Sequence, residues 1–317
     1  MEQRRRRAAS ARVPCRLPAR ERRNGPMPLS SNIVGTCSAP IVSVVDARWT
    51  MAYAAALGDA MPCYMDTNRG VLAHPLFPVC IEWPVQVAMR EQFEKSTLTR
   101  QEAMRGVHAT HDTVLFRPIR PPETLTTQLT VAGVERRKPG AYLVTRLDTV
   151  DQAGTPVCTS WYGGIYRGVE VQGPDFPAKL APAPEQPLVE EGEPLLESRV
   201  EVPAGMAHIY TECARIFNPI HTDASVARAA GLPSIILHGT ATLALAVSRI
   251  VESQARNDPA RISRVAGRFG AMVTMPSTLT VRVLSRDDSA QRASVFFEVL
   301  NGEGRLAIRD GLVVMQA

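Results

Sequence analysis

The sequence has the length and composition of an ordinary globular protein. Its 317 residues, 45% hydrophobic and 21% charged, suffice for one large core or for two cores of domain size. The first 26 residues hold nine Arg against Glu2 and Glu21, so the rest of the chain carries −2 of the total charge of +5. A body with that charge lacks the basic surface of a nucleic-acid-binding protein. No run of about eighteen apolar residues occurs, so we expect a soluble protein that does not cross a membrane.

The cysteines are scattered and contain no C-x-x-C pair. Their spacing therefore favours neither a disulfide framework nor a zinc site. A reducing, cytoplasmic compartment is the simplest interpretation. The six are Cys15, Cys37, Cys63, Cys80, Cys158 and Cys213.

Residues 1–26 are Arg-rich and have few large apolar side chains, so we expect a disordered extension outside the folded body. Two interpretations compete. The segment resembles a transit peptide, which would make the protein mitochondrial. Alternatively, translation starts at Met27, an interpretation favoured by the prolines that interrupt any amphipathic helix.

The body divides into two halves at a segment rich in Pro and Glu. Residues 173–195 have the composition of an exposed linker. The N-terminal domain is expected over residues 40–172 and the C-terminal domain over residues 196–317. The sequence of each domain predicts a short helix, a loop, a longer apolar helix and several strands.

The two halves repeat one another without gaps around their first helices. YAAALGDAMPCYMD, from Tyr53 to Asp66, aligns with YTECARIFNPIHTD, from Tyr210 to Asp223. VLAHPLFPV, which contains His74, aligns in the same way with IILHGTATL. We infer that one supersecondary unit occurs twice.

Alternation and periodicity predict the architecture of each unit. Leu279, Val281 and Val283 alternate with polar residues, as expected for an antiparallel sheet with one buried face. Residues 235–251 are apolar on nearly every side, so this helix should be enclosed. The sequence therefore predicts an α+β fold in which an antiparallel sheet wraps around a central helix, twice.

The segment FNPIHTDASVARAAGLPSIILHGT carries the strongest chemical signal. Asp223 or Thr222 can cap a helix that Gly231 ends, which places His221 just before the helix. Histidine suits proton transfer near neutral pH. His238 precedes the long helix, whose first amides have no partner inside it and could bind a carbonyl oxygen. We assign His238, Gly239 and Thr240 to substrate binding.

This segment resembles the MaoC-like, or (R)-specific enoyl-CoA hydratase, superfamily, whose signature is G-D-x-N-P-x-H-x-D followed by H-G. The resemblance extends over nearly all of the chain after about Ser43 and implies two tandem hotdog folds. It implies that His221 is the general acid/base, that Asn218 positions it, and that the Gly239 amide binds a thioester carbonyl. It also implies an acyl-CoA or acyl-carrier-protein thioester as substrate and no cofactor.

The sequence departs from that signature at one catalytic position, because Ile216 stands where the family has Asp. Losing one of two acid/base groups costs roughly 10²- to 10⁴-fold in rate. In the gapless alignment Asp59 lies opposite Ile216, and Tyr64 opposite His221. One hypothesis is a composite site in which Asp59 and His221 act together; otherwise Asp59 is a cap or a polar relic.

Other residues have a simpler structural interpretation. His208, Cys213, His221 and His238 lack the spacing of metal ligands, so no metal is expected. Arg268 and Phe269 fit an acyl tunnel, but a packed strand predicts the same pattern. We expect His108 and His111 at the surface or an interface. Leu76, Phe77 and Trp83 are equally compatible with an acyl cavity or ordinary core.

Three functions follow, in this order. The first is a hydratase/dehydratase that interconverts trans-2-enoyl and (R)-3-hydroxyacyl thioesters. The second is a catalytically degenerate subunit that binds an acyl thioester or a protein partner. The third is a thioesterase, for which the helix after His238 lacks a carboxylate as far as Ser248. The fused halves predict a monomeric pseudo-dimer or a homodimer.

Overall fold

The computed structural model describes residues 28–96, 98–103, 105–184, 193–289 and 291–316. The Arg-rich segment 1–26 lies outside these ranges, so both interpretations of it stay predictions. No helix within the ranges is both long and apolar enough to cross a membrane.

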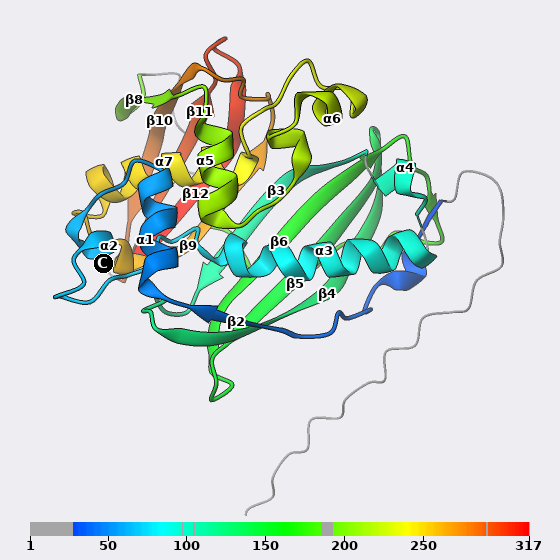
Figure 1. Cartoon of the computed structure of the whole chain (residues 1–317), viewed down its shortest axis with the longest axis horizontal. Coiled ribbons are helices and arrows are strands. Elements are labelled where there is room, and N and C mark those ends of the chain that lie inside the picture. The colour runs from blue at the N-terminus through cyan, green and yellow to red at the C-terminus, as the bar shows by residue number, and fades with distance from the viewer. Residues whose placement is uncertain (1–27, 97, 104, 185–192, 290, 317) are drawn as a thin grey trace, which may run out of the picture.

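Ten strands, five from each half, form one antiparallel sheet (Figure 1). The N-terminal half contributes β2 (Ile41–Val45), β3 (Gly106–Leu115), β4 (Glu123–Arg137), β5 (Gly140–Val150) and β6 (Pro156–Arg167). The C-terminal half contributes β8 (Leu196–Val202), β9 (Ile262–Phe269), β10 (Ser277–Asp288), β11 (Arg292–Leu300) and β12 (Leu306–Gln316). A separate parallel pair joins β1 (Leu29–Ser30) to β7 (Val171–Gln172).

The strand order demonstrates the internal repeat. Across the sheet it is β2-β4-β5-β6-β3-β9-β12-β11-β10-β8. Equivalent strands therefore occur in the same order from each edge to the centre: β2, β4, β5, β6, β3 in the N-terminal half and β8, β10, β11, β12, β9 in the C-terminal half. The halves meet where β3 pairs with β9, which we call the central seam.

One long helix lies in each half: α3 (Pro78–Ser96) and α7 (Gly239–Gln254). Figure 1 shows α3 lying across the strands of its half-sheet. Eleven of the 16 residues of α7 are buried, which confirms the enclosed helix that its apolar sequence predicts. The shorter helices are α1 (Ala47–Ala56), α2 (Pro62–Met65), α4 (Arg100–Ala103), α5 (Met206–Ala214) and α6 (Ala224–Ala229), with 3-10 turns η1 (Ser31–Ile33), η2 (Pro219–His221) and η3 (Pro259–Arg261).

The sheet buries one face of its alternating strands. In β10, Leu279, Val281 and Val283 are all at most 2% exposed, while their neighbours in sequence are more accessible. The α+β architecture of two tandem hotdogs, each a sheet around a central helix, is therefore confirmed.

A buried ion pair joins the halves across the central seam. Arg264 of β9 makes two hydrogen bonds, of 2.8 and 2.6 Å, to the carboxylate of Asp112 on β3. The same guanidinium donates to the backbone carbonyls of Ala181 and Pro182. Ala181 and Pro182 of the predicted linker are thus fastened to the sheet.

The pseudo-twofold axis passes between α1 and α5. Tyr53 and Tyr210 occupy equivalent positions in the repeat, and their hydroxyl oxygens lie 3.3 Å apart. Both side chains are fully buried. This contact places the two motif loops on either side of the axis.

Candidate functional site

His221 is held by hydrogen bonds at both its backbone and its ring. It ends η2, and its N–H donates to the Asn218 carbonyl at 3.1 Å. Its Nδ1 lies 2.8 Å from the carbonyl oxygen of Ile236. A carbonyl oxygen can only accept, so Nδ1 carries the proton and Nε2 presents a lone pair.

The surroundings of His221 keep it neutral. Its side chain is largely buried, and burial lowers its pKa to about 4, against the opposing effect of the bond to Ile236. The imidazole is therefore uncharged at physiological pH. In that state Nε2 can accept a proton.

His238 packs directly against His221, with ring centroids 3.7 Å apart and planes inclined by 25°. Its Nε2 lies 3.3 Å from the hydroxyl of Thr211. Burial, and then the neighbouring His221, lower the pKa of His238 well below its usual value. Two neutral rings can stack in this way, so His238 supports the turn that carries His221.

Gly239 begins α7, and a helix of this kind leaves its first amides without an internal acceptor. A Cβ at this position would lie 3.1 Å from two ring atoms of Phe269, so a side chain would push the backbone and the ring apart. A carbonyl oxygen placed here would meet a free N–H and the positive end of the helix dipole.

The remaining predicted residues have different surroundings. The side chain of Asn218 makes no capping hydrogen bond, so it acts on His221 through its backbone carbonyl. The hydroxyl of Thr240 accepts a hydrogen bond from Tyr210 at 3.2 Å and is buried.

Asp223 caps α6, as its place in the sequence predicts. One carboxylate oxygen accepts from the backbone N–H groups of Ser225 and Val226, at 2.8 and 3.2 Å. The Ser225 hydroxyl donates to the same oxygen at 2.6 Å. These hydrogen bonds lower the pKa of Asp223, which fits a structural carboxylate rather than an acid catalyst.

Ile216 is part of the hydrophobic core. Its side chain is 5% exposed and packs with the residues around α7. The left-handed Arg215, with φ of 58°, turns the chain here so that Ile216 points inward. The position of the family carboxylate is therefore occupied by an apolar side chain that cannot exchange protons.

Asp59 does not meet His221. It is buried, and its carboxylate accepts the backbone N–H of Met61 at 3.4 Å. Burial raises the pKa of Asp59, and the nearby Ser248 hydroxyl opposes the increase. Ser248 lies ten positions beyond His238 along α7, about 15 Å at the rise of an α-helix. Asp59 therefore lies beside the tenth residue of α7 and His221 beside the start of the helix, so the structure does not bring the two side chains together.

Sequence patterns gave no role to a buried carboxylate on the other long helix. Glu82 of α3 is fully buried. The one sequence feature that could have predicted it is a single acidic residue inside the apolar segment PVCIEWPV. His111, expected at the surface or an interface, is 1% exposed and pairs with Gly267 of β9 across the central seam, so it lies at the interface between the two halves. His108 beside it is partly buried.

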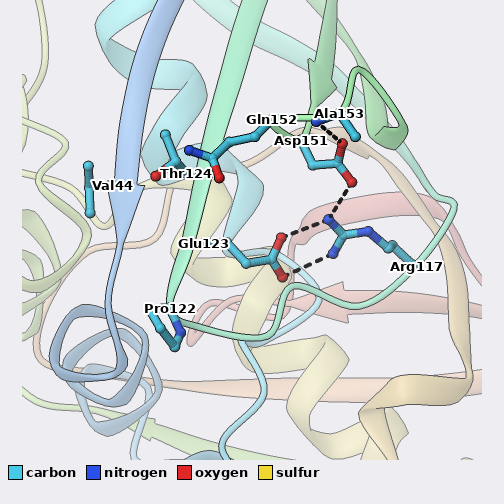
Figure 2. Close-up of a pocket in the computed structure, with 8 residues that line it drawn as sticks. All are labelled: Val44, Arg117, Pro122, Glu123, Thr124, Asp151, Gln152 and Ala153. Carbon is cyan, nitrogen blue, oxygen red and sulfur yellow. Dashed lines mark hydrogen bonds and ion pairs between the residues drawn. The ribbon is translucent and has the colours of Figure 1, made fainter.

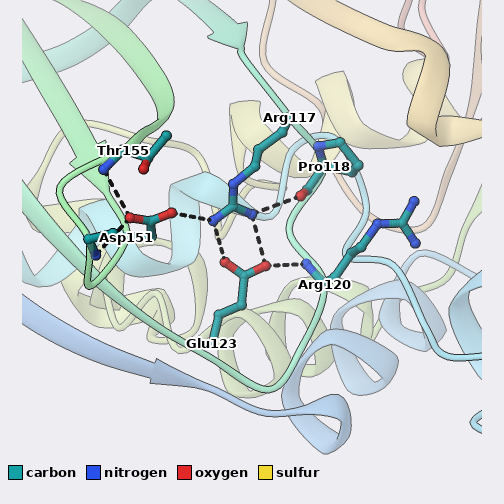
Figure 3. A network of polar contacts seen from close by, with 7 residues as sticks. Arg117, Pro118, Arg120, Glu123, Asp151 and Thr155 are labelled. Carbon is teal, nitrogen blue, oxygen red and sulfur yellow. Dashed lines mark hydrogen bonds and ion pairs between the residues drawn. The ribbon is translucent and has the colours of Figure 1, made fainter.

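An open pocket of about 400 Å³ lies elsewhere, near the β2 edge of the sheet (Figure 2). Its charged groups pair with one another: Arg117 lies 2.7 Å from Glu123 and 3.4 Å from Asp151. Figure 3 shows that Glu123 also accepts from the backbone of Arg120. The pairing fixes the loop between β3 and β4, which is a structural role.

Comparisons with known sequences divide the chain as its internal repeat does. Residues 189–304 match the MaoC like domain family. Residues 32–160 match the FAS1-like, dehydratase domain region. Over 171 residues, which are 52% of this chain, it is 25% identical to the peroxisomal enoyl-CoA hydratase 2 of Arabidopsis thaliana. That match spans about half of the plant protein, 55% of its length.

Solved structures share the fold at low identity. A MaoC-like dehydratase from Phytophthora capsici superposes with a TM-score of 0.73 at 19% identity, covering 89% of this chain and 96% of the other. The full-length peroxisomal multifunctional enzyme type 2 from Drosophila melanogaster gives a TM-score of 0.70 at 21% identity, covering 89% of this chain and 48% of the other.

Proposed function

Because this chain belongs to the MaoC-like superfamily of double-hotdog proteins, we propose that it is an acyl-thioester hydratase/dehydratase. The proposed reaction interconverts trans-2-enoyl and (R)-3-hydroxyacyl thioesters of coenzyme A or an acyl carrier protein. The name of the plant relative and the match to the MaoC like domain support this choice.

One observation carries the proposal: the proton on Nδ1 of His221 is fixed by the Ile236 carbonyl, so Nε2 is a free base beside the start of α7. In hydration, Nε2 takes a proton from water as the water oxygen bonds to C3. The electrons of the C2–C3 double bond move to the thioester oxygen, which the Gly239 amide stabilises. His221 then returns its proton to C2.

The alternative is a degenerate subunit that binds an acyl thioester without converting it. The burial of Ile216 supports this alternative, because the family uses a carboxylate there. A single imidazole with a low pKa is a weak base, and hydration by His221 alone should be slow. The two functions therefore predict measurable and absent turnover, respectively.

The test follows the absorbance of the enoyl-thioester band during incubation with crotonyl-CoA and a medium-chain trans-2-enoyl-CoA. We expect the wild-type protein to consume the band, and His221→Ala to lose at least about 10²-fold in rate. Glu91→Ala, at an exposed position of α3, is the control and should stay active. No turnover together with saturable thioester binding would establish the binding subunit, and release of free thiol would indicate a thioesterase.

A further inference from the structure

A buried chain of hydrogen bonds runs from α3 to the central seam. Glu82 accepts from the Ser160 hydroxyl at 2.5 Å, and Ser160 lies 2.8 Å from the hydroxyl of Thr113. Thr113 in turn lies 2.8 Å from Nε2 of His111. All four side chains are at most 1% exposed.

Both ends of this chain lack a partner. By hydrogen-bond geometry, Oε2 of Glu82 and Nδ1 of His111 have no partner among the residues that the structure describes. The Tyr162 hydroxyl nevertheless lies close enough to the Glu82 carboxyl group to lower its pKa. A buried polar atom without a partner is costly, and native proteins usually satisfy it with water or a ligand. Two such atoms on one network are candidates for hydrogen bonds from water or from a polar ligand group.

Three partly exposed rings connect this network to the proposed thioester site. Phe269 contacts the position of Gly239, as described above, and its ring centroid lies 4.6 Å from that of His108. His108 stacks on Tyr162, also at 4.6 Å, and Tyr162 packs edge-on against His111 at 4.7 Å. These aromatic rings form a continuous layer from the start of α7 to the buried network.

We propose that the acyl chain of the substrate carries a neutral hydroxyl group, which Glu82 binds at the far end of this aromatic layer. The proposal rests on the proposed thioester site and names its substrate class. An acyl chain bound at Gly239 would extend along the rings toward the network. A purely hydrocarbon chain would leave the polar atoms of Glu82 and His111 unpaired.

Charge favours a hydroxyl over a carboxylate. The hydrogen-bonded network and its aromatic layer contain no Lys or Arg, and the Arg264 guanidinium at the seam is engaged by Asp112. A carboxylate on the acyl chain would therefore lie near Glu82 without a cation. A hydroxyl can donate to the ionised carboxylate of Glu82, and it can accept from the O–H of the protonated form.

The pKa of Glu82 agrees with this geometry. Burial raises it to about 7, while the hydroxyls of Ser160 and Tyr162 lower it less. The carboxyl group is thus close to equal populations of its two forms near neutral pH. It can exchange hydrogen bonds with a hydroxyl without the desolvation cost of a fixed charge.

The test compares saturated thioesters that differ only in a terminal hydroxyl, so that binding is measured without turnover. Isothermal titration would use hexanoyl-CoA against 6-hydroxyhexanoyl-CoA, and the corresponding eight-carbon pair. We expect the wild type to bind one hydroxylated member at least about 10-fold more tightly. Glu82→Leu should remove this preference by weakening the hydroxylated ligand and strengthening the hydrocarbon one.

Two further variants distinguish loss of the hydroxyl contact from misfolding of the protein. Glu82→Gln keeps the shape and hydrogen bonds of the side chain and should retain part of the preference. Glu91→Gln, at an exposed position of α3, should bind all four ligands as the wild type does. Thermal unfolding of each variant would establish that it is folded.

The outcomes separate this inference from the proposed function. Equal affinities within both wild-type pairs, or an unchanged preference in folded Glu82→Leu, would overturn the hydroxyl site. Assays with trans-2-hexenoyl-CoA and its 6-hydroxy derivative test hydration independently. Turnover of both substrates at equal kcat/KM leaves hydration standing and removes the hydroxyl site, whereas preferential binding without turnover does the reverse.

Discussion

The two motif loops occupy equivalent places in the repeat, but the histidines they hold do not correspond, since His74 lies opposite His238 and Tyr64 opposite His221. His74 and His221 are also held as opposite tautomers. In the N-terminal half, Nδ1 of His74 accepts the backbone N–H of Leu76 at 3.1 Å, so its proton lies on Nε2. In the C-terminal half, Nδ1 of His221 donates to a carbonyl, so its Nε2 is free. The backbone group that contacts Nδ1 therefore sets the tautomer of each ring. The His74 ring is a donor within the core, whereas the His221 ring can act as a base.

The loops also differ in what lies above the buried histidine. His221 stacks on His238 at 3.7 Å, whereas Tyr64 lies 5.8 Å from His74 at an angle of 45°. Nε2 of His74 donates to the Ser248 hydroxyl, which lies near Asp59 and lowers the pKa of that carboxyl group. The N-terminal loop therefore uses its polar groups to hold α7, and the C-terminal loop leaves one available for chemistry.

Restoring the carboxylate is the strongest way to sharpen this difference. Ile216→Asp should raise kcat/KM for hydration by roughly 10²- to 10⁴-fold, since it supplies the second acid/base group beside His221. The measurement is the decay of the enoyl-thioester band. Ile216→Asn, which has a similar shape without ionisation, is the control and should give no gain. A folded Ile216→Asp variant with wild-type rates would show that the missing carboxylate does not limit the reaction.

Crowding the start of α7 should impair only the C-terminal site. Gly239→Ala brings a methyl group to 3.1 Å from Phe269 and displaces the amide that would bind the carbonyl. We expect kcat/KM to fall about 10- to 100-fold. The double variant Gly239→Ala with Phe269→Leu should recover part of that loss. If the single variant keeps full activity, the amide is not the carbonyl-binding group.

The pH profile should report the buried base. Because the pKa of His221 is lowered to about 4, kcat/KM should be flat between pH 6 and 8 and should decline about tenfold per unit below the pKa. A histidine whose pKa is lowered in the native state contributes stability that is fully present at a pH above its unfolded-state pKa. That stability is lost as the pH falls through its folded-state pKa. An acid limb near pH 6.5 would contradict the buried environment.

Neutralising the buried carboxylate of the N-terminal loop should change stability more than rate. The pKa of Asp59 is raised in the native state by burial, so its contribution to stability is present below its unfolded pKa and decreases as the pH rises through the folded one. Asp59→Asn should therefore unfold at a higher temperature than the wild type at pH 7, with the difference disappearing toward pH 3. Hydration rates should stay within about twofold, since Asp59 lies outside the site. A large loss of rate would restore a catalytic role for Asp59.

Much of the architecture could be predicted from local patterns. One such pattern is the alternation of Leu279, Val281 and Val283, which is typical of a strand with one buried face. Another is the apolar segment after His238, which is typical of an enclosed helix. The gapless repeat gave the equivalence of the two loops. It could not give the distance from Asp59 to His221, because that distance depends on how the two halves pack against each other in the folded chain.

The sequence predicted the site residues that come from one continuous segment. It missed the residues that come from separate helices and strands. His221, His238 and Gly239 come from a single motif, and the structure brings them together. The network of Glu82 and His111 draws on α3, β3 and β6, which only pair in the folded sheet. A lone acid in an apolar helix was its only trace in the sequence.

The Arg264 contacts bear on whether the two hotdogs could exist as separate polypeptides. Without the N-terminal half, the guanidinium would lose Asp112 and the linker carbonyls together. Removing one partner of a buried pair costs about 3–5 kcal/mol, which is a large share of the stability of a small domain. Two genes encoding the halves would therefore have to be expressed together, and gene fusion secures the pairing by supplying both in equal amounts.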